Sequence, residues 1–110
     1  ISRFSDVKQG CFVAENVHIG PECEIGKCTI VNTRAVIDHE SKIGKYCHIS
    51  VNSTVCGRCT IGDNVFLGAG AVVKDKINIC DNVTIGAGAV VCADITESGL
   101  YVGCPAKKIR

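Results

Sequence analysis

Residues 37–67 read IDHESKIGKYCHISVNSTVCGRCTIGDNVFL, and an aliphatic side chain returns in this stretch at every sixth residue. The same step extends in both directions without a slip, so that every sixth position from Ile1 to Val91 is Ile, Val or Leu. Four residues after each aliphatic residue stands a small or β-branched one. A period of six fits neither the 3.6-residue period of a helix nor the alternation of a half-buried strand. It predicts short strands joined by tight corners and wound into a solenoid.

One six-residue repeat cannot be stable by itself. Ordering six residues costs roughly 6–12 kcal/mol, whereas burying one Ile or Val returns roughly 1.5–3 kcal/mol. The repeats must therefore stack through ladder hydrogen bonds and a continuous core. Glycine often follows the aliphatic residue directly, and we expect these glycines to turn the backbone at the corners. They are Gly20, Gly26, Gly44, Gly62, Gly68 and Gly86.

Charge and hydropathy exclude several classes of partner. The 110 residues carry 12 basic and 11 acidic side chains without a basic stripe, which argues against nucleic acid or a membrane surface as the main partner. The longest apolar run, from Val65 to Val73, is too short to span a bilayer, and no signal peptide is recognisable. We expect a soluble cytoplasmic protein. Because the first residue is Ile1 and not Met, we expect a further part of the protein upstream.

The repeat, written [Ile/Val/Leu]-[Gly/small]-x-x-[small]-x, resembles that of the hexapeptide-repeat acyltransferases, and so does the end Gly103-Cys104-Pro105-Ala106-Lys107. The resemblance implies a left-handed parallel β-helix with three repeats in each triangular coil. Residues 1–96 would then form about five coils and residues 97–110 a C-terminal cap or arm. It also implies a homotrimer with sites between subunits, and a loop at residues 103–107 that closes a coenzyme A site.

A narrower resemblance concerns the sialic-acid O-acetyltransferase-like branch, which includes bacterial sugar-nucleotide N-acetyltransferases. The stretches that carry it are Asn32-Thr33, Val36 to Glu40, Ile43-Gly44, His48 to Val51 and the Gly-Cys-Pro-Ala-Lys end. Enzymes of this branch have an upstream α/β domain that binds the nucleotide-sugar, and this sequence lacks it. It would be the acetyl-CoA-binding and catalytic part.

Nine cysteines in so short a chain suggest a disulfide scaffold, but the coil length argues against it. The aligned pairs Cys11/Cys47, Cys23/Cys59 and Cys56/Cys92 are each six repeats, or two coils, apart. Two coils span about 9.6 Å, beyond the reach of a disulfide. Most cysteines are therefore expected to be small core or corner residues. The Cys56-Gly57-Arg58-Cys59 motif leaves open a redox pair or half a zinc site, although no second ligand pair has suitable spacing.

His39 is the main candidate for chemistry, and a solvated corner histidine is the other interpretation. It stands outside the core, Asp38 and Glu40 flank it and could orient its ring, and one coil above it Gly57 leaves room over the imidazole. Acyl transfer to an amine needs a base near neutral pH, which suits the unperturbed histidine pKa of about 6.5. It also needs a donor for the developing oxyanion, which a backbone N–H can supply.

The resemblance assigns the remaining roles in the site. It implies His39 as general base, Glu40 as its orienting partner, Gly57 as oxyanion donor, and Asn32 and His48 as groups that line the substrate site. His48 lies half a coil beyond His39 and so on another side of the prism, which is why we expect a site shared between subunits. A partly exposed His48 without a catalytic role remains the alternative, and His18 is expected at the surface.

A strip of small residues is the candidate site for the acyl donor. Ala69, Ala87 and Pro105 follow one another at intervals of one coil. A pantetheine arm could bind to backbone along this strip, although Gly-Ala pairs can equally be plain corners. The glycines beside the strip are Gly68, Gly70, Gly86 and Gly88. Lys107 and Lys108 could meet the phosphates of coenzyme A or form a solvated tail. No metal cofactor and no cysteine acyl-enzyme are expected.

The favoured function is an acetyl-CoA-dependent N-acetyltransferase for an amino sugar on a nucleotide, of the UDP-4-amino-sugar or GDP-perosamine type. O-acetylation of sialic acid or another hydroxyl is an alternative enzyme function. A non-catalytic trimeric scaffold is a third possibility, and so is a metal site as in the related γ-carbonic anhydrases, for which His18, His39 and His48 are the available histidines.

Overall fold

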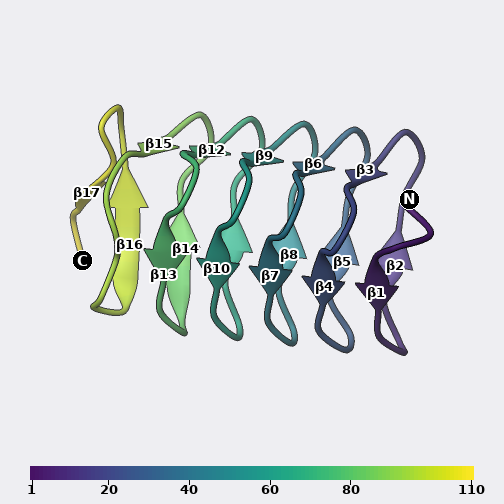
Figure 1. Cartoon of the computed structure of the whole chain (residues 1–110). Helices are drawn as coiled ribbons and strands as arrows, with labels where there is room; N and C mark the ends of the chain where they lie inside the picture. Colours follow the sequence, from purple (N-terminus) through teal and green to yellow (C-terminus); the bar gives the residue numbers. More distant parts are fainter.

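The computed structural model describes all 110 residues and contains strands and turns but no helix, and hence none that could cross a membrane. Its strands stack side by side in an elongated prism of 37 × 21 × 21 Å, with the two termini at opposite ends (Figure 1). This is the predicted left-handed parallel β-helix of about five coils. Three parallel sheets, here named A, B and C, form its faces.

The two-residue strands β1 to β13 and β15 each consist of the sixth residue of one repeat and the aliphatic first residue of the next, whereas β14, β16 and β17 have other bounds. Sheet A contains β1 (Asp6–Val7), β4 (Glu24–Ile25), β7 (Lys42–Ile43), β10 (Thr60–Ile61) and β13 (Asn78–Ile79). Sheet B contains β2 (Phe12–Val13), β5 (Ile30–Val31), β8 (His48–Ile49), β11 (Phe66–Leu67), β14 (Val83–Ile85), β16 (Gly99–Val102) and β17 (Lys107–Lys108). Sheet C contains β3 (His18–Ile19), β6 (Val36–Ile37), β9 (Thr54–Val55), β12 (Val72–Val73) and β15 (Val90–Val91).

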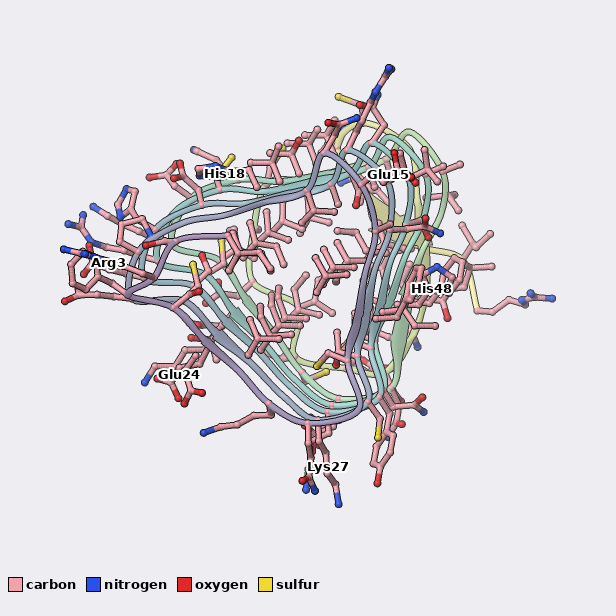
Figure 2. The ribbon with its side chains drawn as sticks, turned by 90° about the vertical axis from the view of Figure 1, so that its right-hand side faces the viewer. Arg3, Glu15, His18, Glu24, Lys27 and His48 are labelled. Atoms are coloured by element: carbon pink, nitrogen blue, oxygen red, sulfur yellow. The ribbon has the colours of Figure 1, made fainter.

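The register is constant through these coils, with each residue paired to the one that stands three repeats later, as Ile25 is to Ile43. The first-place aliphatic residues point inward from all three faces and form one core, in which Ile25, Ile37 and Ile49 are fully buried. Viewed along the prism, third-place residues mark the three corners and sixth-place residues mark the outer faces (Figure 2). The labelled corner residues are Arg3, Glu15 and Lys27, and the labelled face residues are His18, Glu24 and His48.

The backbone turns at the fourth place of the repeat, so the expectation that second-place glycines make the turn was wrong. Fourth-place residues adopt left-handed backbone angles although most are not glycine, as at Glu40 (φ 60°) and Arg58 (φ 59°). The second-place glycines have a different role. A Cβ on Gly26 would lie 2.5 Å from the carbonyl carbon of Gly44 in the next coil. Glycine is therefore required there by the close approach of successive coils.

The cysteines are all free thiols, and several replace hydroxyl groups in the corners. Ser41 Oγ donates to the carbonyl of Cys56 in the next coil over 2.8 Å. Cys23 and Cys59 stand one coil before and one coil after Ser41, and their thiols donate in the same manner to Asp38 (2.8 Å) and Lys74 (3.1 Å). These cysteines are buried corner residues, as predicted, and their weak S–H bonds tie successive coils together.

The last coil is shorter than the others. Ile79 bridges to Ile95, and Ile85 pairs with Tyr101, so each of these pairs is closer in sequence than the regular register would make it. β16 continues sheet B in parallel, and β17 then returns antiparallel to it at the C-terminal end (Figure 1). This end is held by side chains as well, because Tyr101 donates its hydroxyl to the Glu97 carbonyl over 2.7 Å.

Candidate active site

His39 lies in the corner that joins sheet C to sheet A. We call this corner, made of residues 38–41 and 56–59, the His corner. His39 holds the third place of its repeat, two coils after Arg3, whose corner Figure 2 shows. Its ring is therefore outside the core, and its side chain is 41% exposed. Its carbonyl accepts the N–H of Arg58 in the next coil over 2.9 Å, which anchors it to that coil.

The ring of His39 is oriented by one of its two neighbouring carboxylates. Nδ1 of His39 lies 3.0 Å from Oε1 of Glu40, whereas Nε2 makes no hydrogen bond within the chain. Asp38 does not reach the ring, because its Oδ1 accepts the backbone N–H of His39 over 2.8 Å. The expectation that both carboxylates could orient the imidazole is therefore correct only for Glu40. A proton on Nδ1 leaves Nε2 as the basic atom.

Glu40 is held by two cationic or proton-donating partners. Its Oε1 also lies 3.3 Å from Nη2 of Arg58, one coil further along the corner. The hydrogen bond from His39, followed by that from Arg58 and its charge, lowers the pKa of Glu40. Glu40 is thus a carboxylate at neutral pH, able to accept a hydrogen bond from Nδ1–H and to stabilise a positive charge on the ring.

Gly57 lies directly against the ring of His39. A Cβ on Gly57 would be 2.8 Å from Nε2 and 2.9 Å from Cε1, so no other residue fits without moving the imidazole. Gly57 is buried, and its carbonyl accepts the N–H of Lys76. Its own N–H donates to no acceptor in the chain. Since a buried N–H without a partner is costly, this donor is available to a ligand next to Nε2.

The corner between sheets B and C, here named the Ala corner (residues 68–71 and 86–89), has free donors of the same kind. The N–H groups of Ala69 and Ala87 make no hydrogen bond in the chain. At Gly70 and Gly88 an added Cβ would meet nothing within 4 Å, so the space outside the corner is open. This arrangement fits an extended chain bearing amide groups, such as a pantetheine arm.

Pro105 was expected to continue the column of Ala69 and Ala87, but it does not. The last coil is shortened, because only Cys92, Ala93 and Asp94 separate β15 from Ile95, and the loop between β16 and β17 is therefore shifted. The loop still borders the Ala corner, since the N–H of Val90 donates to the carbonyl of Gly103 over 3.0 Å. Lys107 follows at the start of β17 and is exposed.

His48 and Asn32 lie away from the His corner of the same chain. His48 is on β8, on the outer face of sheet B, where its ring meets that of Phe66 edge-on at 5.1 Å (Figure 2). Its Nε2 is buried and has no hydrogen-bond partner, beside a hollow of about 320 Å³. Asn32 opens the turn that follows sheet B, where its Oδ1 accepts the N–H of Thr33 over 2.7 Å. As predicted, one chain does not bring His39 and His48 together.

Two family models match the repeat. One, for the bacterial transferase hexapeptide (six repeats), matches residues 40–75, and the other, for the hexapeptide repeat of succinyl-transferase, matches residues 58–93. The acetyltransferase domain of PglB from Neisseria gonorrhoeae, in complex with acetyl coenzyme A, is similar with a TM-score of 0.96. It is 30% identical over 98% of this chain and 53% of its own. This chain belongs to the hexapeptide-repeat acyltransferase family.

Other solved members are similar in fold. An H141A mutant of GDP-perosamine N-acetyl transferase from Caulobacter crescentus, in complex with CoA and GDP-perosamine, has a TM-score of 0.82 and 34% identity over 97% of this chain and 54% of its own. A galactoside acetyltransferase in complex with coenzyme A has a TM-score of 0.88 and 26% identity over 96% of this chain and 64% of its own. The chain thus spans about half the length of the first two relatives. No curated protein sequence matches it significantly.

Sequence reasoning missed the contact of Arg58 with Glu40 in this hexapeptide-repeat protein. The signal was present, because the two residues stand one coil apart and are opposite in charge. The pairing was overlooked because Arg58 was considered only as part of the Cys56–Cys59 motif. That motif has no sign of redox function: burial raises the pKa of both thiols, whereas reactive cysteines have lowered values.

The histidines form no metal site within one chain. His18 is exposed on sheet C, as expected, while His39 is in the His corner and His48 on sheet B. No three His, Cys, Asp or Glu side chains are grouped as metal ligands. A metal site made from histidines of two copies of the chain would differ from this, and bound zinc in the purified protein would reveal it.

Proposed function

We propose that this chain is the catalytic β-helix of an acetyl-CoA-dependent acetyltransferase that N-acetylates an amino sugar carried on a nucleotide. The observation that carries the proposal is the arrangement of His39, Glu40 and Gly57. A ring nitrogen without a partner stands beside a buried backbone N–H without a partner, and a carboxylate fixes the other ring nitrogen. This is the set of groups that acyl transfer to an amine requires.

The proposed reaction needs no covalent enzyme intermediate. The amine of the acceptor attacks the thioester carbonyl, and Nε2 of His39 accepts the proton that the nitrogen loses as the C–N bond forms. The N–H of Gly57 donates to the oxygen on which negative charge develops. The C–S bond then breaks, and coenzyme A leaves as a thiolate that takes up a proton. Glu40 stabilises the imidazolium that exists during this step.

The acyl donor is expected along the Ala corner, which is on a different edge of the prism from the His corner. A complete site therefore needs a second copy of this chain, and we propose a homotrimer with sites between subunits. An exposed apolar column on sheet B supports such an assembly. Phe12 (59% exposed), Ile30 (36%) and Phe66 (43%) occupy the same place in successive coils on either side of His48.

The acceptor is proposed from similarity. The relative from Caulobacter crescentus is named for N-acetylation of GDP-perosamine. Its sequence identity to this chain is 34%, compared with 30% for the PglB domain and 26% for the galactoside acetyltransferase. We propose that His48 and Asn32 line the acceptor site of the neighbouring subunit, and the buried Nε2 of His48, which has no hydrogen-bond partner, supports this. The galactoside acetyltransferase, at 26% identity, favours a hydroxyl acceptor as the second candidate. The same base would then remove a hydroxyl proton.

Calorimetric titration of the purified chain with acetyl-CoA, together with its mass in solution, tests the proposal. We expect a trimer with one saturable site for each subunit. Release of coenzyme A is then measured with UDP-4-amino sugars, GDP-perosamine, sialic acid and galactosides as acceptors, in the full-length protein. A folded trimer that does not bind acetyl-CoA would contradict the proposal and favour the scaffold. Stoichiometric zinc in that trimer would favour the metal site.

A further inference from the structure

Arg58 and Glu40 occupy the same place in two successive coils of the His corner. Both are fourth-place residues with left-handed backbone angles, φ 59° and 60°, so their side chains leave the corner in the same manner. The N–H of Arg58 donates to the carbonyl of His39 over 2.9 Å, which fixes the two coils relative to one another at this point. The backbone thereby places the Arg58 side chain next to the Glu40 carboxylate.

One oxygen of Glu40 serves two donors. Oε1 lies 3.0 Å from Nδ1 of His39 and 3.3 Å from Nη2 of Arg58. The three side chains are 41%, 42% and 56% exposed, and ion pairs at such exposure add little to stability. Without a second partner the Glu40 side chain would be free to rotate into solvent. We therefore expect the contact with Arg58 to orient the Glu40 carboxylate and to add little to stability.

We propose that Arg58 is a positioning residue that holds Glu40 Oε1 against His39 Nδ1, so that Nε2 faces Gly57 as the free basic atom. This inference rests on the proposed function, because it assigns Arg58 a role in the reaction of His39. It also has an electrostatic side. The guanidinium offsets part of the negative charge of Glu40, and its removal leaves that charge uncompensated beside Nδ1.

The charged groups around His39 are few. Asp38 is engaged with the backbone N–H of His39, and Glu22 stands one coil before Glu40 in the same corner. Arg58 is the residue of the next coil that forms an ion pair with Glu40. Lys76 follows one coil later with the same backbone angle, φ 61°, and makes no ion pair, so it offers a matched control. Removing the charge at Arg58 should thus affect His39, and removing it at Lys76 should not.

The first test needs no substrate. Proton–nitrogen NMR spectra of the imidazole rings give the tautomer of His39 in the full chain, with His39→Ala to assign the signals. We expect the wild type and Lys76→Gln to carry the proton on Nδ1, and Arg58→Gln to show a mixture of both tautomers. An unchanged tautomer in Arg58→Gln would overturn the proposal. Because no acetyl-CoA is present, this result does not depend on whether the chain proves to be an acetyltransferase.

The second test is the pH profile of turnover. In Arg58→Gln we expect kcat to fall about tenfold near pH 6.5 and less at pH 8.5, because a general base is lost in proportion to its protonated fraction. Lys76→Gln should follow the wild-type profile, and Arg58→Lys should recover part of the loss at low pH. An equal loss at every pH, together with a lower thermal midpoint, would mean that Arg58 is only structural and would overturn the proposal.

Discussion

Two corners of this molecule are built from the same repeat but use their backbone donors differently. In the corner between sheets A and B, here named the Asp corner (residues 44–47, 62–65 and 80–82), two third-place N–H groups, those of Lys45 and Asp63, are satisfied by the next coil. Asp63 accepts the N–H of Lys45 over 2.9 Å, and Asp81 accepts the N–H of Asp63 over 2.7 Å. In the His corner the equivalent N–H of Gly57 has no acceptor.

The reason lies in the residue before the donor. Glycine stands directly before both of these donors, as Gly44 and Gly62, and the Asp63 carboxylate occupies the space that a Cβ of Gly44 would need. In the His corner Asp75 stands one coil after Gly57, but the second-place residue before Gly57 is Cys56, and the N–H of Gly57 makes no hydrogen bond. Burial, followed by the charge of Asp75, raises the pKa of Cys56. We expect the Cys56 side chain to keep the Asp75 carboxylate from the N–H of Gly57. The Asp corner and the corner proposed to be catalytic thus differ in the side chain that precedes the donor.

The largest effect is expected from a change that removes the frame common to both corners. Ile43 is 3% exposed on β7, between the His corner and the Asp corner. Ile43→Asp should abolish folding, because a buried unpaired carboxylate is very costly. Circular dichroism and size-exclusion chromatography would measure this, with Lys42→Ala on the outer face as a control that stays folded. A folded Ile43→Asp variant would refute the stacked core.

The second prediction compares one substitution in each corner, His39→Ala, which should affect turnover, and Asp63→Ala, which should affect stability. His39→Ala should lower turnover by roughly 10²–10⁴ while the thermal midpoint is kept, since it removes the proposed general base from a partly exposed place. Asp63→Ala should do the opposite and lower the free energy of unfolding by about 1 kcal/mol with turnover retained. Urea unfolding and release of coenzyme A measure the pair. Full turnover in His39→Ala would remove this residue from the mechanism.

Glycine substitutions sharpen the same contrast. Gly57→Ala places a Cβ 2.8 Å from Nε2 of His39 and should displace the ring, with a loss of turnover of about 10² and little loss of stability. Gly62→Ala in the Asp corner would meet the backbone nitrogen of Asp81 at 2.8 Å and should mainly destabilise the fold. If both variants changed only stability, the two corners would not differ in function.

Cys56→Gly should turn the His corner partly into an Asp corner. Without the Cys56 side chain, the Asp75 carboxylate can reach the N–H of Gly57 and compete with the oxyanion, which we expect to lower turnover about tenfold. Cys56→Ser keeps the space filled and should remain active. The double variant Cys56→Gly/Asp75→Asn should recover activity, and failure to recover would show that the loss has another cause.

The smallest effect concerns acid stability. The hydrogen bond from His39 and then Arg58 lowers the pKa of Glu40 in the folded chain below its ordinary 4.5. The stabilisation from Glu40 is therefore complete above pH 4.5 and is lost as the pH falls through the lower folded value. Between pH 7 and pH 3, Glu40→Gln should lose slightly less stability in urea than the wild type. Identical losses would mean that the contacts of Glu40 add nothing to stability.

Much of the fold and part of the site could be predicted from the residues alone. The core positions follow from the step of six residues, and the exposed His18, the buried cysteines and the separation of His39 from His48 follow once the family resemblance adds a coil of three repeats. The turn residues could not be predicted, because Glu40 and Arg58 adopt angles that composition does not favour for them. The direction of Asp38 was also missed, since its carboxylate can reach either the ring or its neighbour's N–H.

The sequence by itself determined a stacked solenoid of short strands, because an uninterrupted six-residue step gives one inward face that only stacking can bury, and the family resemblance added the left-handed coil of three repeats. It also determined that the strongest candidate base stands outside the core beside a glycine. Only the tertiary structure decided which donors stay free, which carboxylate holds His39, and that the last coil is shortened. These depend on contacts between successive coils, where side-chain volume at one place decides whether a hydrogen bond at the next can form.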